Sequence, residues 1–194
     1  DYLSYDDSIL PISLGMQVDG AYPFYECRNM KLMTTWKLSK EPSYDRYNNE
    51  VVAIPEKDVK WETQSLMDSS YRHSLPLKLE LKAGVHKLKF DIKEGNFLLG
   101  NVKLKAPESI PAYSGSEKAD GSELITVQGE KYFSTNSSSI HAVVEYDTAL
   151  DPYEVDDTVL NTLDSDSFAD AGQKVTYSFE VKKEGNYNIG LNYR

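Results

Sequence analysis

The chain has 194 residues, 40% of them hydrophobic, and carries 31 acidic against 21 basic side chains, a net charge of -10. This length and hydrophobic content suit one large or two small folded domains and exclude a disordered chain. The acidic balance excludes nucleic acid and an anionic membrane surface as partners, because both require a basic face. It suits a neutral or cationic ligand.

A single cysteine, Cys27, cannot close a disulfide within the chain and has no CxxC partner. No apolar run approaches the ~20 residues that a membrane-spanning helix needs. The sequence starts at Asp1 rather than Met and shows no signal peptide. We therefore interpret it as a mature or excised piece.

Strand patterns dominate the first part of the chain. Residues 12–18 (ISLGMQV) alternate apolar with small or polar side chains, which predicts a strand that ends in the turn Asp19-Gly20. Residues 27–38 fit either a strand or a short helix, and their Thr-Thr-Trp run favours the strand. The polar residues 39–60 predict a long loop, of the kind that often carries function.

Four further strands are expected between residues 61 and 104. The first covers residues 61–66, with Trp61 assigned to the core. Residues 75–81 (LPLKLEL) are apolar at alternate positions, and similar runs follow at 85–92 and 97–104. Glycine turns separate these last three runs, so they predict an antiparallel meander.

A stretch rich in proline, glycine, serine and charge, residues 107–122, is predicted to be a linker. Strand patterns resume beyond it, at residues 123–128, 142–146, 174–181 and 187–193. No segment shows a helical period. The predicted fold class is therefore all-β, an antiparallel β-sandwich, with residues 1–106 and 123–194 on either side of the linker.

Three segments resemble carbohydrate-binding jelly rolls of the galactose-binding-like type. Residues 172–194 (GQKVTYSFEVKKEGNYNIGLNYR) resemble the middle strands, residues 123–132 (ELITVQGEKY) the first strand, and residues 75–104 the closing strands. The motifs VDGAYPFYE and SYDRYNNE are similar to those of modules attached to extracellular solute-binding proteins of Firmicutes sugar ABC transporters. The resemblance implies a non-catalytic carbohydrate-binding module of a bacterial sugar-uptake or cell-surface protein, anchored by lipid or by other domains.

The resemblance also implies an unusual order of parts. In such modules the strand like 123–132 comes first and those like 75–104 come last, whereas here the order is reversed. Residues 1–106 thus look like the rear half of one sandwich and residues 123–194 like the front half of the next. A half sandwich exposes an apolar face. We expect the halves to combine within the chain or by exchange in a dimer; neighbouring domains are the third alternative.

Catalytic signatures are absent from the sequence. The three histidines, His73, His86 and His141, are far apart, and no HExxH, GxSxG, P-loop or GxGxxG motif occurs. Carboxylates gather in predicted loops, where solvated side chains are commoner than a glycosidase pair. We expect no enzyme activity. A structural or interaction sandwich without sugar binding is the second hypothesis, and a hydrolase is the least favoured.

Structural calcium is the one cofactor that the resemblance raises, since related modules hold an ion between a first-strand Glu and a last-strand Asp. Glu130 matches one position, but Gln128 stands where a second Glu is common. Gly100 or Asn101 stands where the aspartate would be. The acidic residues of 151–170 do not follow the EF-hand spacing. Glu130 is therefore the single candidate metal ligand.

Sugar binding uses planar aromatic side chains, which stack on pyranose rings, and nearby polar groups that take the hydroxyls. The long loop and its flanks offer both. The predicted ligand-binding residues are Trp36, Tyr44, Asp45, Arg46, Tyr47, Tyr71 and Arg72. Tyr44→Ala or Tyr47→Ala is expected to abolish binding and leave folding intact. The rival interpretation is that the loop contacts a neighbouring domain.

Overall fold

A computed structural model describes residues 1–38, 41–113 and 123–193. Within these ranges the chain contains one 3-10 helix, η1 (Tyr25–Arg28), no α-helix, and strands that pair only in antiparallel fashion. The all-β prediction is confirmed. No helix in the described ranges has the length and apolar character needed to cross a bilayer. Residues 114–122 of the predicted linker lie outside them.

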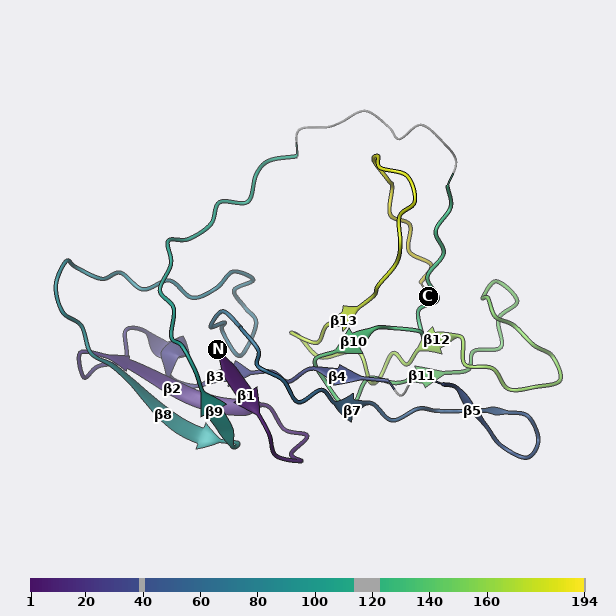
Figure 1. The fold of residues 1–194 in the computed structure, drawn as a ribbon, viewed down its shortest axis with the longest axis horizontal. Helices are drawn as coiled ribbons and strands as arrows, with labels where there is room; N and C mark the ends of the chain where they lie inside the picture. Colours follow the sequence, from purple (N-terminus) through teal and green to yellow (C-terminus); the bar gives the residue numbers. More distant parts are fainter. Residues whose placement is uncertain (39–40, 114–122, 194) are drawn as a thin grey trace.

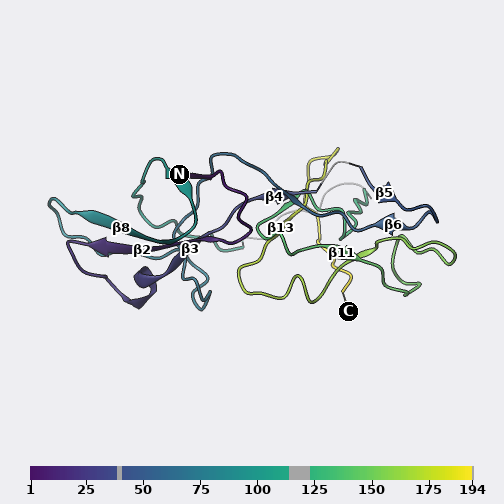
Figure 2. The same cartoon turned by 90° about the horizontal axis from the view of Figure 1, so that it is seen from below.

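The strands gather in two groups along the longest axis of the molecule (Figures 1 and 2). The first group comprises β1 (Tyr2–Ser4), β2 (Ile12–Val18), β3 (Met30–Leu32), β8 (Leu88–Glu94) and β9 (Phe97–Leu99). The second comprises β4 (Trp36–Lys37), β5 (Ser43–Tyr44), β6 (Glu50–Val51), β7 (Glu56–Lys57), β10 (Ser134–Thr135), β11 (Ala142–Val143), β12 (Thr162–Leu163) and β13 (Val175–Thr176).

The main hydrophobic core lies in the first group, around β2. This strand is central in the sheet β3-β2-β8, where Leu14 lies opposite Met30 on one side and Ile92 on the other. The alternation of apolar and polar side chains explains why this segment forms a strand, because its apolar side chains then all face the core. The buried cluster consists of Tyr2, Ile12, Leu14, Met16, Cys27, Met30 and Leu32.

Strand β1 runs between two segments that are distant in the sequence. On one side it pairs with β9, Tyr2 opposite Leu99. On the other side Tyr2 and Glu62 exchange two backbone hydrogen bonds of 2.9 and 2.8 Å. The residues before Glu62 and those after Leu99 are therefore held on opposite sides of Asp1.

One sheet joins the two halves of the chain. Its order, β13-β10-β4-β7, combines two strands from beyond residue 123 with two from before residue 60, and Thr135 lies opposite Trp36. The β5–β6 hairpin adds to this junction, because Glu50 N donates to Thr158 O at 2.9 Å. Within the described residues the halves thus share backbone hydrogen bonds.

Several predicted strands differ from the structure. Residues 75–81, 123–128 and 187–193 form no strand, and the runs 97–104 and 174–181 keep only β9 and β13. The meander prediction was wrong, because β8 pairs with β2 and β9 pairs with β1. Residues 27–38 divide into η1, β3 and β4, so neither a single strand nor a helix was correct. Period-two patterning marks which side chains share a face, but a ladder also requires a partner backbone.

Candidate functional site

The β5–β6 hairpin brings together four of the seven predicted ligand-binding residues. Tyr44 ends β5, and Asp45 organises the turn that follows. The Asp45 carboxylate accepts hydrogen bonds from the backbone N–H of Tyr47 at 2.8 Å and of Asn49 at 2.9 Å. These bonds, led by one from the Asn49 side chain, lower the pKa of Asp45. The turn is thus formed by its own side chains.

Two tyrosines project from this hairpin tip into solvent. Tyr44 is 55% and Tyr47 65% exposed. The guanidinium of Arg46 lies 4.5 Å from the centre of the Tyr47 ring, a cation–π distance. The tip therefore offers aromatic faces and hydrogen-bond donors together, as the sequence predicts.

One edge of the same hairpin packs against the second half of the chain. Asn48 Nδ2 donates to Asp157 Oδ2 at 3.0 Å, and Thr158 N donates to Asn49 Oδ1 at 3.1 Å. One edge of the predicted loop therefore contacts the second half of the chain, whereas the side chains of Tyr44 and Tyr47 remain exposed to solvent.

The other three predicted residues are placed elsewhere. Trp36 is buried in β4 beneath the ammonium group of Lys57, 5.4 Å from its ring, so its indole has no free face for a ligand. Tyr71 is half-buried against Gly172, and Arg72 is exposed in the adjoining turn. Within the described residues no hydrogen bond or ring contact joins these three to the hairpin tip, so the seven residues do not form one site.

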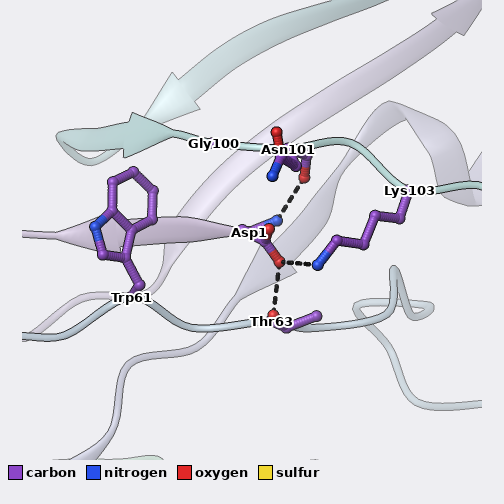
Figure 3. A pocket seen from close by; sticks show the side chains of 6 residues that line it. All are labelled: Asp1, Trp61, Thr63, Gly100, Asn101 and Lys103. Carbon is purple, nitrogen blue, oxygen red and sulfur yellow. Dashed lines mark hydrogen bonds and ion pairs between the residues drawn. The ribbon is translucent and has the colours of Figure 1, made fainter.

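A different tryptophan lies beside a hollow at the start of β1 (Figure 3). Trp61 was expected in the core but is 54% exposed. The hollow has a volume of about 370 Å³, and its lining residues are Asp1, Trp61, Thr63, Gly100, Asn101 and Lys103. A Cβ added to Gly100 would lie 2.9 Å from Trp61 Cζ3, so the glycine makes room for the indole.

Polar groups face the indole across this hollow (Figure 3). Asp1 Oδ1 accepts hydrogen bonds from Thr63 Oγ1 at 2.6 Å and from Lys103 Nζ at 3.0 Å. The amino nitrogen of Asp1 donates to the carbonyl of Asn101 at 2.7 Å. Asp1 and Lys103 carry the only charged side chains among the lining residues, and they form an ion pair with each other. The lining side chains thus add no net charge, and the hollow suits an uncharged polar ligand.

The exposure of Trp61 has a sequence signal that the core assignment overlooked. The following residues on its own face of an extended run, Thr63 and Ser65, are polar, so the run lacks an apolar alternation that would point the indole inward. In the structure Glu62 takes the inward role instead: its backbone pairs with Tyr2, and its carboxylate accepts from Thr35 N at 2.9 Å. Side chains on the two sides of Glu62 consequently point outward.

Glu130, the candidate metal ligand, is 4% exposed, and neither of its carboxylate oxygens has a hydrogen-bond partner among the described residues. Burial raises its pKa, and the nearby charges of Glu50 and Asp151 add to this shift. Orphaned oxygens would suit a cation. However, no set of three ligating side chains includes Glu130 in the described part of the chain. Among the residues that the structure describes, Glu130 therefore lacks the further carboxylates that would help it hold a calcium ion, and burial favours the protonated form of its carboxyl group.

No family model, curated protein or solved structure matches this chain.

Proposed function

We propose that the chain is a non-catalytic carbohydrate-binding module and that its sugar site is the hollow beside Trp61. The exposed indole carries this proposal. The exposed face of an indole is not stabilised by hydrophobic burial. A pyranose ring stacked on the indole with its flat apolar face would cover this surface and remove it from water.

The polar lining supports a sugar as the class of ligand. Asp1 uses Oδ1 for both of its side-chain hydrogen bonds, and Oδ2 makes none within the described residues. With the amide of Asn101 and the hydroxyl of Thr63, it offers acceptors and donors to neighbouring hydroxyl groups. The volume of about 370 Å³ lies near the lower end of the range for small-molecule sites.

The same lining supports binding without catalysis. Hydrolysis of a glycosidic bond generally requires two carboxyl groups that flank the bond. Asp1 is the single acidic side chain around this hollow, and its carboxylate is paired with Lys103 at 3.0 Å. It lacks the second carboxyl group that would complete a general acid and base pair.

Affinity electrophoresis and titration calorimetry with a panel of soluble polysaccharides test the proposal. We expect at least one glycan to bind and Trp61→Ala to weaken its affinity roughly tenfold or more, because stacking is lost. Trp61→Phe keeps an aromatic face and should retain part of the affinity. Tyr113→Ala is the matched control, since this tyrosine is 94% exposed and is not among the residues that line the hollow.

The hairpin tip provides the comparison that locates the site. Tyr44→Ala and Tyr47→Ala should bind as the unmodified chain does if the hollow is the site. Loss of binding in these two variants with Trp61→Ala unaffected would move the site to the hairpin. If no glycan binds, carbohydrate binding is wrong.

The second candidate function is a structural spacer sandwich without sugar binding. Large apolar side chains are exposed along the unpaired segments of both halves, including Leu104, Phe179, Ile189 and Leu191. In this proposal a second copy covers them by strand exchange, because each chain carries both rear-type and front-type segments. Sedimentation analysis should then show a dimer, and a monomer at all concentrations would contradict it.

The setting of the parent protein follows only from the motif resemblance. We propose a bacterial extracellular or cell-surface location and a part in sugar uptake through an ABC transporter. The net charge of -10 agrees with a neutral or cationic ligand. Genes for permeases beside the coding sequence would support this setting, and their absence would weigh against it.

A further inference from the structure

Three potential metal ligands from two distant segments converge beside the main core. Glu26 belongs to η1, whereas Asp68 and His73 lie in the turn that follows residue 66. One ligand atom from each, two carboxylate oxygens and one imidazole nitrogen, lie within 4.8 Å of one another. Among the described residues this is the one set of at least three such groups.

The two segments are held firmly where they meet. Cys27, next to Glu26, is fully buried in the core and anchors η1. Asp68 is 3% exposed, and its carboxylate accepts from Ser70 N at 2.9 Å and from Arg72 N at 3.2 Å. Ser70 Oγ also lies 2.8 and 2.9 Å from the two carboxylate oxygens and donates to them, so the carboxylate is held in a fixed orientation.

The charges of this cluster lack a compensating cation. Within the described residues neither carboxylate forms an ion pair with a lysine or arginine, and the imidazole of His73 pairs with neither of them. Arg28, two residues from Glu26, lies instead over the rings of Tyr22 and Tyr25 at 5.6 and 5.8 Å. Arg72, adjacent to His73, is exposed, and its guanidinium forms no ion pair within the described residues. Two negative charges therefore face one imidazole without a positive partner.

We propose that Glu26, Asp68 and His73 bind one divalent transition-metal ion, for which Zn²⁺ is the best match. An imidazole with two carboxylates is a ligand set for zinc, whereas calcium and magnesium prefer oxygen ligands alone. Zinc also binds more tightly than manganese or iron(II) to such a set. A water molecule completes the four ligands.

Small side-chain rotations suffice to close the site. Ligand atoms on one tetrahedral zinc lie about 3.4 Å apart, given metal–ligand distances near 2.1 Å. His73 is exposed and Glu26 is half-buried, so both can move toward the fixed carboxylate of Asp68. The bound ion would tie η1 to the turn at residues 68–73, a structural role that does not depend on sugar binding.

Zinc titration of the chelator-treated, tag-free chain, in competition with a chromophoric chelator, tests the proposal. We expect one equivalent to bind. His73→Ala and Glu26→Gln should each weaken binding roughly tenfold or more, because each removes one ligand atom. His86→Ala and His141→Ala are the matched controls, because they remove the other two histidines and should not change the affinity.

Thermal unfolding gives a second measurement. Zinc should raise the midpoint of the unmodified chain and of both control variants. It should leave the midpoint of His73→Ala unchanged, and this variant is expected to fold because His73 is exposed. The proposal is overturned if the unmodified chain shows no saturable zinc site, if Glu26→Gln binds normally, or if all three histidine variants lose affinity equally.

Discussion

The ring of Tyr71 occupies the space that any side chain at Gly172 would need. A Cβ built on Gly172 would lie 2.0 Å from Tyr71 Cζ. The glycine also has a φ of +88°, and Tyr71 itself has a φ of 51°. The carbonyl of Gly172 accepts from Asn136 Nδ2 at 2.8 Å, so its backbone cannot easily move away. This contact links the first half of the chain to the second.

Gly172→Ala should therefore destabilise the protein strongly. The methyl group would clash with the ring and force a left-handed backbone on an alanine, at a combined cost of about 3 kcal/mol. Gly20→Ala is the control: Gly20 has a φ of +86° but nothing within 4 Å of its Cβ position, so only about 1 kcal/mol is expected. Urea unfolding of both variants gives the comparison. Equal losses would mean that the ring contact is unimportant.

A double variant separates the ring contact from the backbone strain. Adding Tyr71→Ala to Gly172→Ala removes the obstructing ring, so the double variant should lose less than the sum of the two single losses. Simple additivity of the three unfolding free energies would contradict this coupling.

Glu130→Gln should become increasingly more stable than the unmodified chain as the pH rises. Burial raises the pKa of Glu130 above its ordinary value of 4.5, so the folded state favours the neutral acid. The stability that this preference contributes is complete below the unfolded pKa and is lost as the pH rises through the folded one. Glutamine keeps the neutral shape at every pH.

The measurement is the free energy of unfolding at several values between about pH 4 and pH 7. Glu154→Gln, at an exposed glutamate, is the control for a general change in net charge. The same pH dependence in the unmodified chain and in Glu130→Gln would show that Glu130 does not titrate with folding.

The Cys27 thiol should resist alkylation in the native protein. It is fully buried in the main core, and burial raises its pKa, which disfavours the reactive thiolate. Reaction with a thiol reagent should require opening of this core and should accelerate across the urea unfolding transition. Rapid labelling in the absence of denaturant would contradict the burial of this thiol.

Asp19→Asn should lower the pKa of His86. The hydrogen bond between His86 Nδ1 and Asp19 Oδ2, 2.7 Å long, is the main cause that raises this pKa, followed by the contact with the carbonyl of Lys82. Asparagine tolerates the φ of 51° at this position. The raised pKa contributes stability below about pH 6.5, which is lost as the pH rises through the folded value.

Titration of the imidazole signals by NMR measures the effect. The His141 signal is the internal reference, because its neighbour Asp164 is untouched. An unchanged His86 pKa in the variant would exclude the pairing with Asp19.

The sequence predicts the fold best where a strand has partners on both sides. The predicted strand at residues 12–18 coincides with β2, which lies between β3 and β8. Residues 75–81 alternate just as regularly but form no ladder. An alternating pattern predicts which face of a strand is buried, but it does not predict which strand will pair with it. Strand pairing depends on contacts between segments that are distant in the sequence.

The same limit applies to the candidate sites. Tyr44 and Tyr47 are close in sequence, so a single turn suffices to bring them together as predicted. The hollow beside Trp61 needs the exchange of hydrogen bonds by Tyr2 with Glu62 and with β9, which no local pattern contains. Tryptophan is a residue type suited to stacking on a sugar, but Trp36 is buried because its strand, β4, lies between β10 and β7.

The shared sheet β13-β10-β4-β7 has a consequence for a nicked chain. Proteolysis within residues 105–113, which are exposed and form no strand, would sever the covalent path between the halves and leave their common ladder uncut. The two fragments should then remain associated, and separately produced fragments should reassemble. The intact peptide chain at this point brings the two halves together during folding. It contributes little to their association once the shared sheet has formed.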